Sequence, residues 1–369
     1  MVKRIRSNPL ATAWHRSLTT LTRQTMLASQ RAVTQAVKSA RKSASKPGSA
    51  AAAVKRLNPL LAPPAKPPRG AGDWLSGIAV GAAGMRRFRL YRPPGVKPTE
   101  RLPLMVMLHG CSQDAAVFAS STRMNRIAAR ERFLVLYPEQ DRLANPQGCW
   151  NWFDTDSRRA YGEAALILQA VDQACMLYPV DRNRIAVAGL SAGASMAALL
   201  ASRHPERFKA VVMHSGIPPG TAHSSLSALG AMGGRRVTHA PAPRPLLLQQ
   251  APQAWPPLLV IHGQLDHVVS PRNGRAAAEL WAATAGAKAG TPREVRRGER
   301  HPMTLTDFKR SGRTAVTLIE ISRLGHAWSG GAANQAYGDG NGPDASRLAW
   351  SFAAKQFAAK QSSRIPARG

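Results

Sequence analysis

The sequence predicts an α/β domain built on a doubly wound, mostly parallel sheet with helices on both faces. From about residue 86 onward, short apolar runs alternate with segments of helical periodicity. The apolar runs are nearly continuous, which is typical of parallel strands that are buried on both faces. The regular alternation of the two kinds of segment indicates that helices connect successive strands.

Five apolar runs are the expected strands of this sheet. They cover residues 102–110, 132–139, 184–190, 209–216 and 256–263. Three other segments carry apolar residues at helical spacing and are the expected helices. They cover residues 115–131, 163–178 and 271–286.

The end of the chain adds a pair of strands and a helix. Two apolar runs, 301–308 and 314–321, flank the turn-like stretch KRSGR. They are expected to form a hairpin or two neighbouring edge strands. A closing helix is expected over 343–357, because Pro and Asp precede apolar residues at helical spacing there.

Composition divides the chain into a tail and a body. The net charge is +31, and residues 1–72 hold fourteen Lys or Arg and no acidic residue. Residues 39–72 consist mainly of Ala, Pro, Lys and Ser, which cannot bury enough apolar surface to fold. We therefore expect a largely disordered basic tail and linker over 1–72 and a catalytic domain over 85–357. Residues 217–256 are too long for an ordinary connection and are the expected cap-like insertion.

The tail has two interpretations. Leu10, Trp14, Leu18 and Leu21 recur at near-helical spacing, so an amphipathic helix near 10–30 could bind an anionic surface. A solvated, disordered tail is the alternative. No apolar run approaches the roughly 18 residues of a transmembrane helix. Arg, His and Thr interrupt every candidate signal-peptide core, so the cytoplasm is the expected location.

The stretch GLSAG, residues 189–193, has the pattern of a nucleophile elbow. In this motif a strand turns at once into a helix, and the serine at the turn holds its hydroxyl clear of the sheet. Gly189 and Gly193 would remove side chains where strand and helix meet. Ser191 is therefore the candidate nucleophile.

A serine hydroxyl needs a general base, and the base needs an acid that orients it. Asp266 follows the expected strand 256–263, and His326 follows the expected strand 314–321. The order nucleophile, acid, base is that of hydrolases with this elbow. Other histidines lie in strands, in the tail or beside the proposed acid, where structural roles suit them better.

A tetrahedral intermediate needs fixed N–H donors for its oxyanion. The N–H of Ala192, directly after the nucleophile, is one expected donor. The N–H of Cys111, in a loop after the strand 102–110, is the other. We expect Gly110 to support this loop, and His109 to support it through hydrogen bonds without taking part in proton transfer.

Several motifs together resemble the poly(3-hydroxybutyrate) depolymerase-like esterases, which are related to feruloyl and acetylxylan esterases. They are LHGCSQ, LYPEQ, NPQGCWNWF, YPVDRNRIAVAGLSAGASMA, HGQLDHVV and GHAWSGG. The resemblance covers residues 85–357. It implies an α/β-hydrolase fold, a Ser191, Asp266 and His326 triad, and an oxyanion hole beside Cys111. It also implies substrates that are esters of 3-hydroxyalkanoic acids or acyl groups on plant cell-wall sugars.

The chain departs from the family in two places. Secreted relatives have a signal peptide and often a substrate-binding module, whereas this chain begins with a basic tail. Where similar sequences often have a Gly-rich stretch and an Asp, this one reads AYGEAAL, and Glu163 is expected to cap the following helix.

Aromatic residues near the motifs are candidates for substrate binding. The stretch CWNWF places Trp150, Trp152 and Phe153 together, and Trp328 follows His326 by two residues. They are expected to line a cleft for an acyl chain or a ring. For CWNWF the alternative is an aromatic plug in the core.

The three cysteines are too few for a disulfide scaffold or a metal knuckle. Cys175 is most simply a buried helix residue. The resemblance implies that Cys111 and Cys149 meet, either as a disulfide that braces the oxyanion loop or as two packed thiols, the form that a reducing cytoplasm favours.

These observations predict a serine esterase that needs no metal and no organic cofactor. The expected substrates are poly- or oligo(3-hydroxyalkanoate)-type esters or short-chain esters. A feruloyl or acetylxylan esterase is one alternative. The other is a surface- or nucleic-acid-binding protein that uses the basic tail and carries a vestigial hydrolase body.

Overall fold

The computed structural model describes residues 70–97, 99–235 and 254–362. The chain divides into two units, Met1–Pro64 and Ala65–Gly369, and every element below belongs to the second unit. The expected helix near 10–30 and nearly all of the tail over 1–72 lie outside the described residues. About half of the insertion expected over 217–256 also lies outside them.

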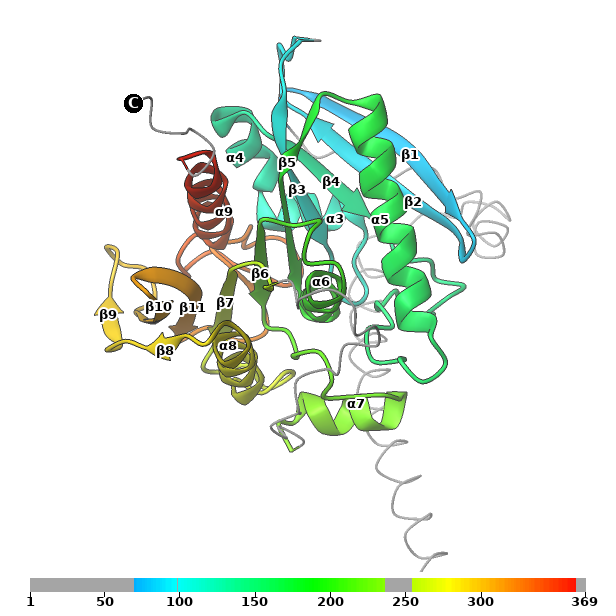
Figure 1. Cartoon of the computed structure of the whole chain (residues 1–369). Helices are drawn as coiled ribbons and strands as arrows, with labels where there is room; N and C mark the ends of the chain where they lie inside the picture. The colour runs from blue at the N-terminus through cyan, green and yellow to red at the C-terminus, as the bar shows by residue number, and fades with distance from the viewer. Residues whose placement is uncertain (1–69, 98, 236–253, 363–369) are drawn as a thin grey trace, which may run out of the picture. The chain divides into compact units, whose positions relative to one another are not determined.

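One mixed sheet of 11 strands forms the centre of the domain (Figure 1). Its strands are β1 (Asp73–Gly81), β2 (Gly84–Arg92), β3 (Leu102–Leu108), β4 (Leu134–Pro138), β5 (Val180–Leu190), β6 (Ala210–His214), β7 (Leu258–Gly263), β8 (Lys288–Ala289), β9 (Arg293–Val295), β10 (Met303–Arg310) and β11 (Arg313–Ile321). The order is β1-β2-β4-β3-β5-β6-β7-β11-β10-β8, with β9 paired to β10. A separate two-stranded sheet pairs β12 (Trp328–Ser329) with β13 (Gly338–Asp339).

The helices connect these strands or close the fold. They are α3 (Ala115–Thr122), α4 (Met124–Glu131), α5 (Arg159–Leu177), α6 (Ala192–Arg203), α7 (Ser225–Met232), α8 (Arg272–Ala285) and α9 (Ala345–Ser362). Within the described ranges, every helix is too short or too polar to cross a bilayer.

The centre of the sheet is parallel and its edges are antiparallel. Pairing is parallel from β4 through β3, β5, β6 and β7 to β11. The pairs of β1 with β2, β2 with β4, and β10 with its neighbours are antiparallel. The predicted doubly wound α/β sheet is confirmed, and its strands and helices form the α/β-hydrolase fold.

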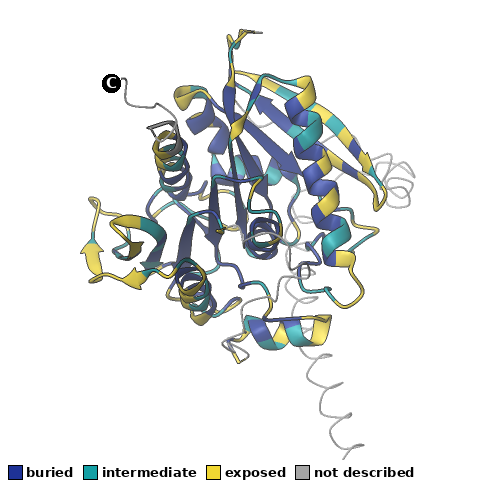
Figure 2. Cartoon of the chain, in the orientation of Figure 1, coloured by how far each residue is buried: buried dark blue, intermediate teal, exposed yellow. Residues whose placement is uncertain are grey.

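Each face of the sheet has its own hydrophobic core, because successive side chains of a strand point to opposite faces. On β3, Leu104 and Val106 pack in the core that also holds residues of α5, α6 and α8. Met105 and Met107 pack in the core that holds residues of α3, α4 and α9. Figure 2 shows the central strands buried between these helices.

Two expected elements take a different form. The expected helix over 115–131 is broken at Arg123, whose φ of 55° lies in the left-handed region that ends helices. The runs 301–308 and 314–321 form a hairpin, as expected. However, β11 also pairs in parallel with β7, so it lies inside the sheet.

The sheet begins at β1, which starts at Asp73. The domain was expected to start later, at residue 85. β1 was not predicted because most of its side chains are exposed or half-buried and its apolar residues are scattered. It pairs with β2 along its whole length. A Cβ on Gly77 would lie 2.1 Å from Phe88 Cζ, so the buried Phe88 ring lies over this glycine.

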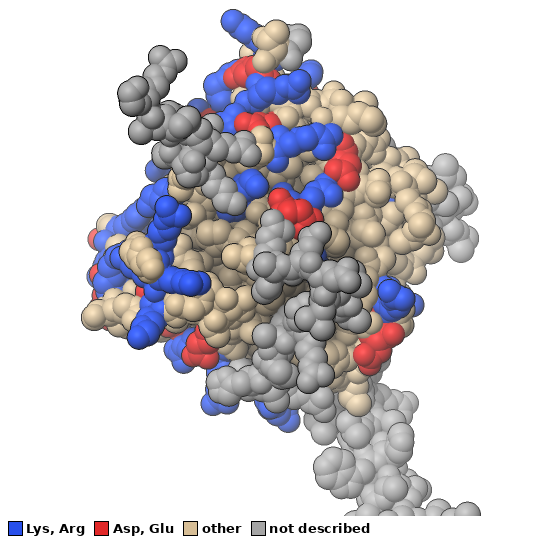
Figure 3. Space-filling model, in the orientation of Figure 1, with Lys and Arg blue, Asp and Glu red and all other residues tan. Residues whose placement is uncertain are grey.

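The opposite edge of the sheet is strongly basic. Lys288, Arg293, Lys309, Arg310 and Arg313 are all exposed on or beside the short edge strands. Figure 3 shows Lys and Arg gathered over the side of the molecule where these strands lie. Short strands and like charges at a sheet edge discourage pairing with another chain.

The register of the parallel strands aligns their carboxyl ends. Leu108 pairs with Gly189, Leu190 with His214, and Gly263 with Ile321. Loops that leave these ends therefore meet at one edge of the sheet, which is where ligands bind in open α/β sheets.

Candidate active site

Ser191 stands alone between a strand and a helix. β5 ends at Leu190 and α6 begins at Ala192. The backbone of Ser191 has φ 55° and ψ −121°, a strained conformation for a residue with a side chain. Its N–H donates to the His214 carbonyl at 2.9 Å, which holds the turn against β6. The geometry is that of the predicted elbow.

The two glycines of the motif allow this turn because backbone atoms of other residues lie too close to leave room for a Cβ at either position. A Cβ on Gly189 would lie 2.3 Å from the carbonyl carbon of Gly193. A Cβ on Gly193 would lie 2.1 Å from the Leu108 carbonyl oxygen. The start of α6 can therefore press against the end of β3, next to the loop that carries Cys111.

Asp266 and His326 meet across two neighbouring loops. His326 Nδ1 lies 2.8 Å from Asp266 Oδ2. The Asp266 side chain is fully buried, and that of His326 keeps 10% exposure. The structure thus brings together the two residues proposed as acid and base, and their catalytic roles stay a prediction.

Close backbone contact at the end of β7 brings these two loops together. A Cβ on Gly263 would lie 2.2 Å from the Leu324 carbonyl oxygen. The same carbonyl accepts the Leu265 N–H at 3.0 Å. The loop that bears Asp266 is thus fixed directly to the loop that bears His326.

Asp266 is held in its charged form. Burial opposes ionisation, but hydrogen bonds from His262 and His326 outweigh it and hold the pKa of Asp266 far below its usual range. The N–H groups of Val268 and Val269 also donate to Oδ1, at 3.0 and 2.8 Å. His262 Nε2 lies 2.9 Å from the Val269 carbonyl oxygen and 3.4 Å from Asp266 Oδ2, so one N–H can serve both oxygens.

His214 supports the loop of His326 from below. It is fully buried beside Trp328, with ring centroids 5.1 Å apart. Its Nε2 accepts the Ser329 N–H at 3.1 Å. Burial, together with the nearby His262 and His326, lowers the pKa of His214 to about 3. The structure therefore gives His214 a structural role, in agreement with its place at the end of a strand.

In the part of the chain that the structure describes, no hydrogen bond joins Ser191 Oγ to His326. In enzymes without substrate, such contacts are often long and tighten only when substrate binds. Ser191 Oγ and His326 Nε2 therefore remain available to a ligand.

The loop 109–113 lies beside Ser191. A Cβ on Gly110 would lie 3.6 Å from the Leu190 carbonyl oxygen. Among the hydrogen bonds of the described residues, none uses the N–H of Cys111 or of Ala192. Both expected oxyanion donors are thus unengaged.

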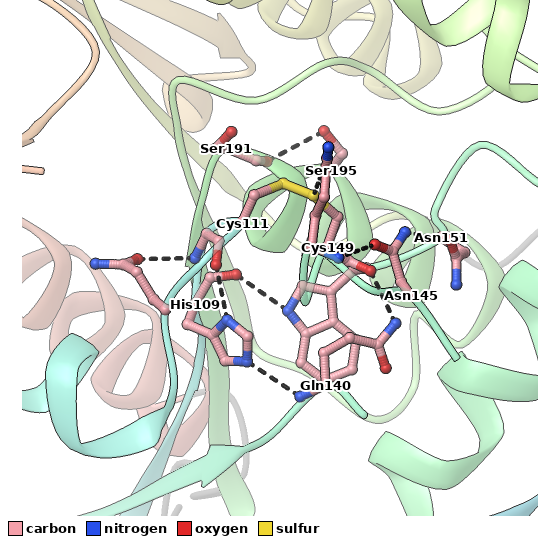
Figure 4. The surroundings of a disulfide bond; sticks show 12 residues. His109, Cys111, Gln140, Asn145, Cys149, Asn151, Ser191 and Ser195 are labelled. Carbon is pink, nitrogen blue, oxygen red and sulfur yellow. Dashed lines mark hydrogen bonds between the residues drawn. A yellow bond between two sulfur atoms is a disulfide. The ribbon is translucent and has the colours of Figure 1, made fainter. Parts of the chain in front are cut away.

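A disulfide joins Cys111 to Cys149, with a Cα–Cα distance of 4.2 Å. Figure 4 shows the bridge close to Ser191. It closes a loop across 38 residues, and the model of chain entropy assigns such a loop about 4 kcal/mol of stabilisation. Cys175 is free and buried in α5, as the sequence predicts.

His109 fixes the backbone of this loop. Its Nδ1 donates to the Gly110 carbonyl at 2.8 Å, and its Nε2 accepts the Gln140 N–H at 3.1 Å. Burial lowers the pKa of His109 to about 4, so the ring stays neutral at pH 7. Both ring nitrogens are engaged, which fits the expected supporting role.

A buried carboxylate lies under the loop that carries Cys149. Glu163 Oε1 accepts from Gln140 Nε2 and from Asn151 Nδ2, each at 2.7 Å. Its Oε2 accepts the Asn151 N–H at 2.9 Å. Gln140 Nε2 also donates to the Cys149 carbonyl at 2.9 Å, and its side-chain oxygen accepts from the buried Arg86. Glu163 therefore links Gln140 to Asn151, which lie on either side of Cys149 in the sequence.

The expectation that Glu163 caps its helix is wrong. α5 begins at Arg159, its N-cap is Arg158, and no side chain caps it. Glu163 lies in the first turns and points to the loop 140–151 instead. No local pattern in the sequence indicates this network, because it joins four separate segments, those of Arg86, Gln140, Asn151 and Glu163.

Trp150 and Trp328 were expected to line the substrate cleft, and this expectation needs correction. Both indoles are fully buried, and they pack in the cores on opposite faces of the sheet. Trp150 Nε1 donates to the His109 carbonyl at 3.0 Å, and Trp328 Nε1 donates to Ser346 Oγ at 3.1 Å. The two tryptophans lie next to motif residues in the sequence, and in the structure they support the site from within the cores.

Trp152 and Phe153 occupy an intermediate position. Trp152 is buried with only 7% exposure, and Phe153 is half-buried beside it in a T-shaped contact. Phe153 therefore stays a prediction as a substrate contact, whereas Trp152 fits the core alternative better.

The fold is that of an α/β hydrolase, and loops at the carboxyl ends of its strands carry Ser191 and the pair of Asp266 with His326. A family model described as Esterase PHB depolymerase matches residues 86–296, which is more than half of the chain. The chain belongs to this family.

Similar proteins are esterases and a depolymerase. The chain is 35% identical to poly(3-hydroxyalkanoate) depolymerase C of Paucimonas lemoignei, over 46% of this chain and 42% of that protein. It is 26% identical to feruloyl esterase B of Neurospora crassa, over 54% of this chain and 70% of the esterase. The chain thus matches less than half the length of that depolymerase.

A solved structure shares the fold. The acetyl xylan esterase from Aspergillus awamori superimposes with a TM-score of 0.57, covering 70% of this chain and 94% of the esterase. The sequence identity is 19%, so this likeness concerns the fold alone.

In the described ranges, no three His, Cys, Asp or Glu side chains are grouped so that they could hold a metal ion.

We predict that Glu163→Gln lowers the free energy of unfolding by about 3 kcal/mol, because buried charge-assisted hydrogen bonds are lost and Arg86 keeps no buried counter-charge. Urea unfolding measures the change. The matched control is Glu299→Gln, whose side chain is 99% exposed. An unfolding curve for Glu163→Gln that coincides with the wild type would contradict this account of the network.

We also predict that stability falls as the pH falls below about 6.5, because the folded protein holds His109 neutral. The contribution of His109 is complete above its unfolded pKa and is lost as the pH falls toward 4, where the loss reaches roughly 3 kcal/mol. Urea unfolding of His109→Gln between pH 6 and pH 4.5 should show a slope smaller by about one proton. The control is His267→Gln, at an exposed position. Equal slopes for wild type and His109→Gln would refute the prediction.

Proposed function

We propose that this protein is a serine-dependent carboxylic ester hydrolase that works through an acyl-enzyme intermediate. The observation that carries the proposal is the 2.8 Å contact of His326 with the buried, ionised Asp266, at the sheet edge where Ser191 occupies a strained turn. Membership of the Esterase PHB depolymerase family supports the same reaction class.

In the first half-reaction, His326 Nε2 takes the proton of Ser191 Oγ, and the oxygen attacks the ester carbonyl carbon. The carbonyl electron pair moves to oxygen, and the N–H groups of Cys111 and Ala192 stabilise the resulting oxyanion. The carbon–oxygen bond to the alcohol then breaks. His326 returns its proton to the leaving alcohol, and Asp266 stabilises the imidazolium in between.

In the second half-reaction, water takes the place of the alcohol. His326 removes a proton from the water as its oxygen attacks the acyl carbon. The tetrahedral intermediate collapses, the bond to Ser191 Oγ breaks, and His326 protonates that oxygen. The acid leaves, and the serine is free again.

The substrates that we propose are poly- or oligo(3-hydroxyalkanoate)-type esters and short-chain esters. The similarity to the Paucimonas lemoignei depolymerase supports this choice. The similarity to feruloyl esterase B supports the alternative, a feruloyl or acetylxylan esterase. No feature of the described residues favours nucleic-acid binding by the tail, which lies outside them.

The disulfide bears on location. A lasting Cys111–Cys149 bond forms in an oxidising compartment and not in a reducing cytoplasm. We therefore favour an oxidising compartment over the cytoplasm expected from the sequence.

The test of this function is ester hydrolysis by the full chain and by Ser191→Ala. We expect Ser191→Ala to lower kcat by roughly 10³-fold or more, because the nucleophile is removed. The control is Ser202→Ala, since Ser202 lies in the same helix and its hydroxyl donates to the Leu199 carbonyl. Hydroxybutyrate oligomers, ethyl ferulate and acetylated xylan, assayed side by side, distinguish the substrate classes. A Ser191→Ala variant with wild-type rates would exclude the serine mechanism.

A further inference from the structure

The loop after His326 carries an aromatic residue, Tyr337, whose ring lies next to the proposed general base. The rings of Tyr337 and His326 lie 6.4 Å apart, in a T-shaped arrangement at 85°. This separation lies within the range of favourable aromatic contacts. Tyr337 is also 42% exposed, whereas the tryptophans near the site are buried.

The backbone of Tyr337 is held in an unfavourable conformation. Its φ is 60°, which is a genuine outlier for a bulky residue. Such strain persists only where the surroundings impose it, often at ligand sites.

The surroundings do impose the conformation. The Tyr337 carbonyl accepts the Trp328 N–H at 2.7 Å, at the pairing of β12 with β13. Gly331 in the same loop is fixed to α3 and its end, because its carbonyl accepts from Arg123 Nη2 at 2.9 Å. The next N–H, that of Ala332, donates to the Ser121 carbonyl at 2.8 Å. The ring is thus presented by an anchored loop.

Two further exposed apolar residues belong to the loop that carries Asp266. Leu265 and Val268 flank Asp266 in sequence and are 51% and 48% exposed. The loop of Leu265 is bonded directly to the loop of His326 through Leu324. The two loops that carry Asp266 and His326 therefore each include exposed aromatic or aliphatic side chains.

We propose that Tyr337 contacts the alcohol part of the ester and determines specificity for that part. The inference rests on the proposed function, in which His326 protonates the leaving alcohol oxygen. That oxygen must come within hydrogen-bond reach of His326 Nε2, so the first carbons of the alcohol lie next to the groups around His326. The carbonyl oxygen points to Cys111 and Ala192 instead.

The proposal separates the two half-reactions. Water replaces the alcohol in deacylation and has no apolar group for Tyr337 to contact. Removal of the ring should therefore slow acylation by esters of bulky alcohols and leave deacylation unchanged. A ring that merely positioned His326 would affect both half-reactions for every ester.

The test compares wild type, Tyr337→Asn and Tyr337→Phe. Asn tolerates a positive φ, so it removes the ring without new backbone strain, and Phe keeps the ring. Tyr337→Gly is the second ring-free variant if the Asn variant does not fold. The control is Met176→Asn, which removes an exposed apolar side chain. Met176 lies at the end of α5, just before the start of β5, whereas Ser191 follows the end of β5.

Two ester series supply the measurement. One series keeps butyrate and changes the alcohol from ethanol to 2-phenylethanol, and the other keeps ethanol and lengthens the acyl chain from acetate to octanoate. We expect Tyr337→Asn to lose about tenfold in kcat/KM for phenylethyl butyrate relative to ethyl butyrate. We expect the same acyl-chain preference as in wild type, and Tyr337→Phe close to wild type. The slow phase after a p-nitrophenyl butyrate burst reports deacylation and should be unchanged.

Three results would overturn the proposal while wild type remains an active serine esterase. They are a uniform loss over both series, a changed acyl-chain preference, or no change with the alcohol. A wild type that hydrolyses no ester in either series would instead refute the proposed function, and the inference with it.

Discussion

The close approach of α6 to the end of β3 is the constraint on which the site depends. A Cβ at Gly193 would lie 2.1 Å from the Leu108 carbonyl, so a glycine is required there. This contact places the N-terminus of α6, and with it Ala192, against the loop of Cys111. It also leaves Ser191 no room for a relaxed turn, which accounts for its positive φ. One backbone contact therefore positions both the proposed nucleophile and the proposed oxyanion donors.

The remaining parts of the site are fixed by polar groups that are themselves buried. Below the oxyanion loop, Glu163 organises Gln140 and Asn151, and Gln140 holds His109 in one tautomer. On the other side, His214 holds the loop of His326 through the Ser329 N–H. Such preorganisation matters because donors that need not move stabilise a developing charge at the least cost. The disulfide adds a covalent link within the same region.

The sequence predicts the parts of the site that depend on local pattern. The strands before Ser191, Asp266 and His326 are continuous apolar runs, so their ends and the chain order of the three residues could be recognised. For Trp150 and Trp328 the sequence does not distinguish cleft from core, because both lie next to motif residues and yet pack in the cores. The role of Glu163 and the position of Tyr337 arise from contacts between distant segments, and β1 lacks the apolar pattern of a central strand.

Active-site labelling followed by mass spectrometry tests the central claim most directly. The full chain would be treated with a fluorophosphonate and digested with trypsin, which releases residues 185–203 with Ser191, Ser195 and Ser202 on one peptide. Fragmentation then locates the label. The account predicts one adduct per chain, on Ser191, that is lost when His326→Ala removes the base. A label on Ser195, on Ser202 or on another peptide, or no label on a folded chain, would contradict it.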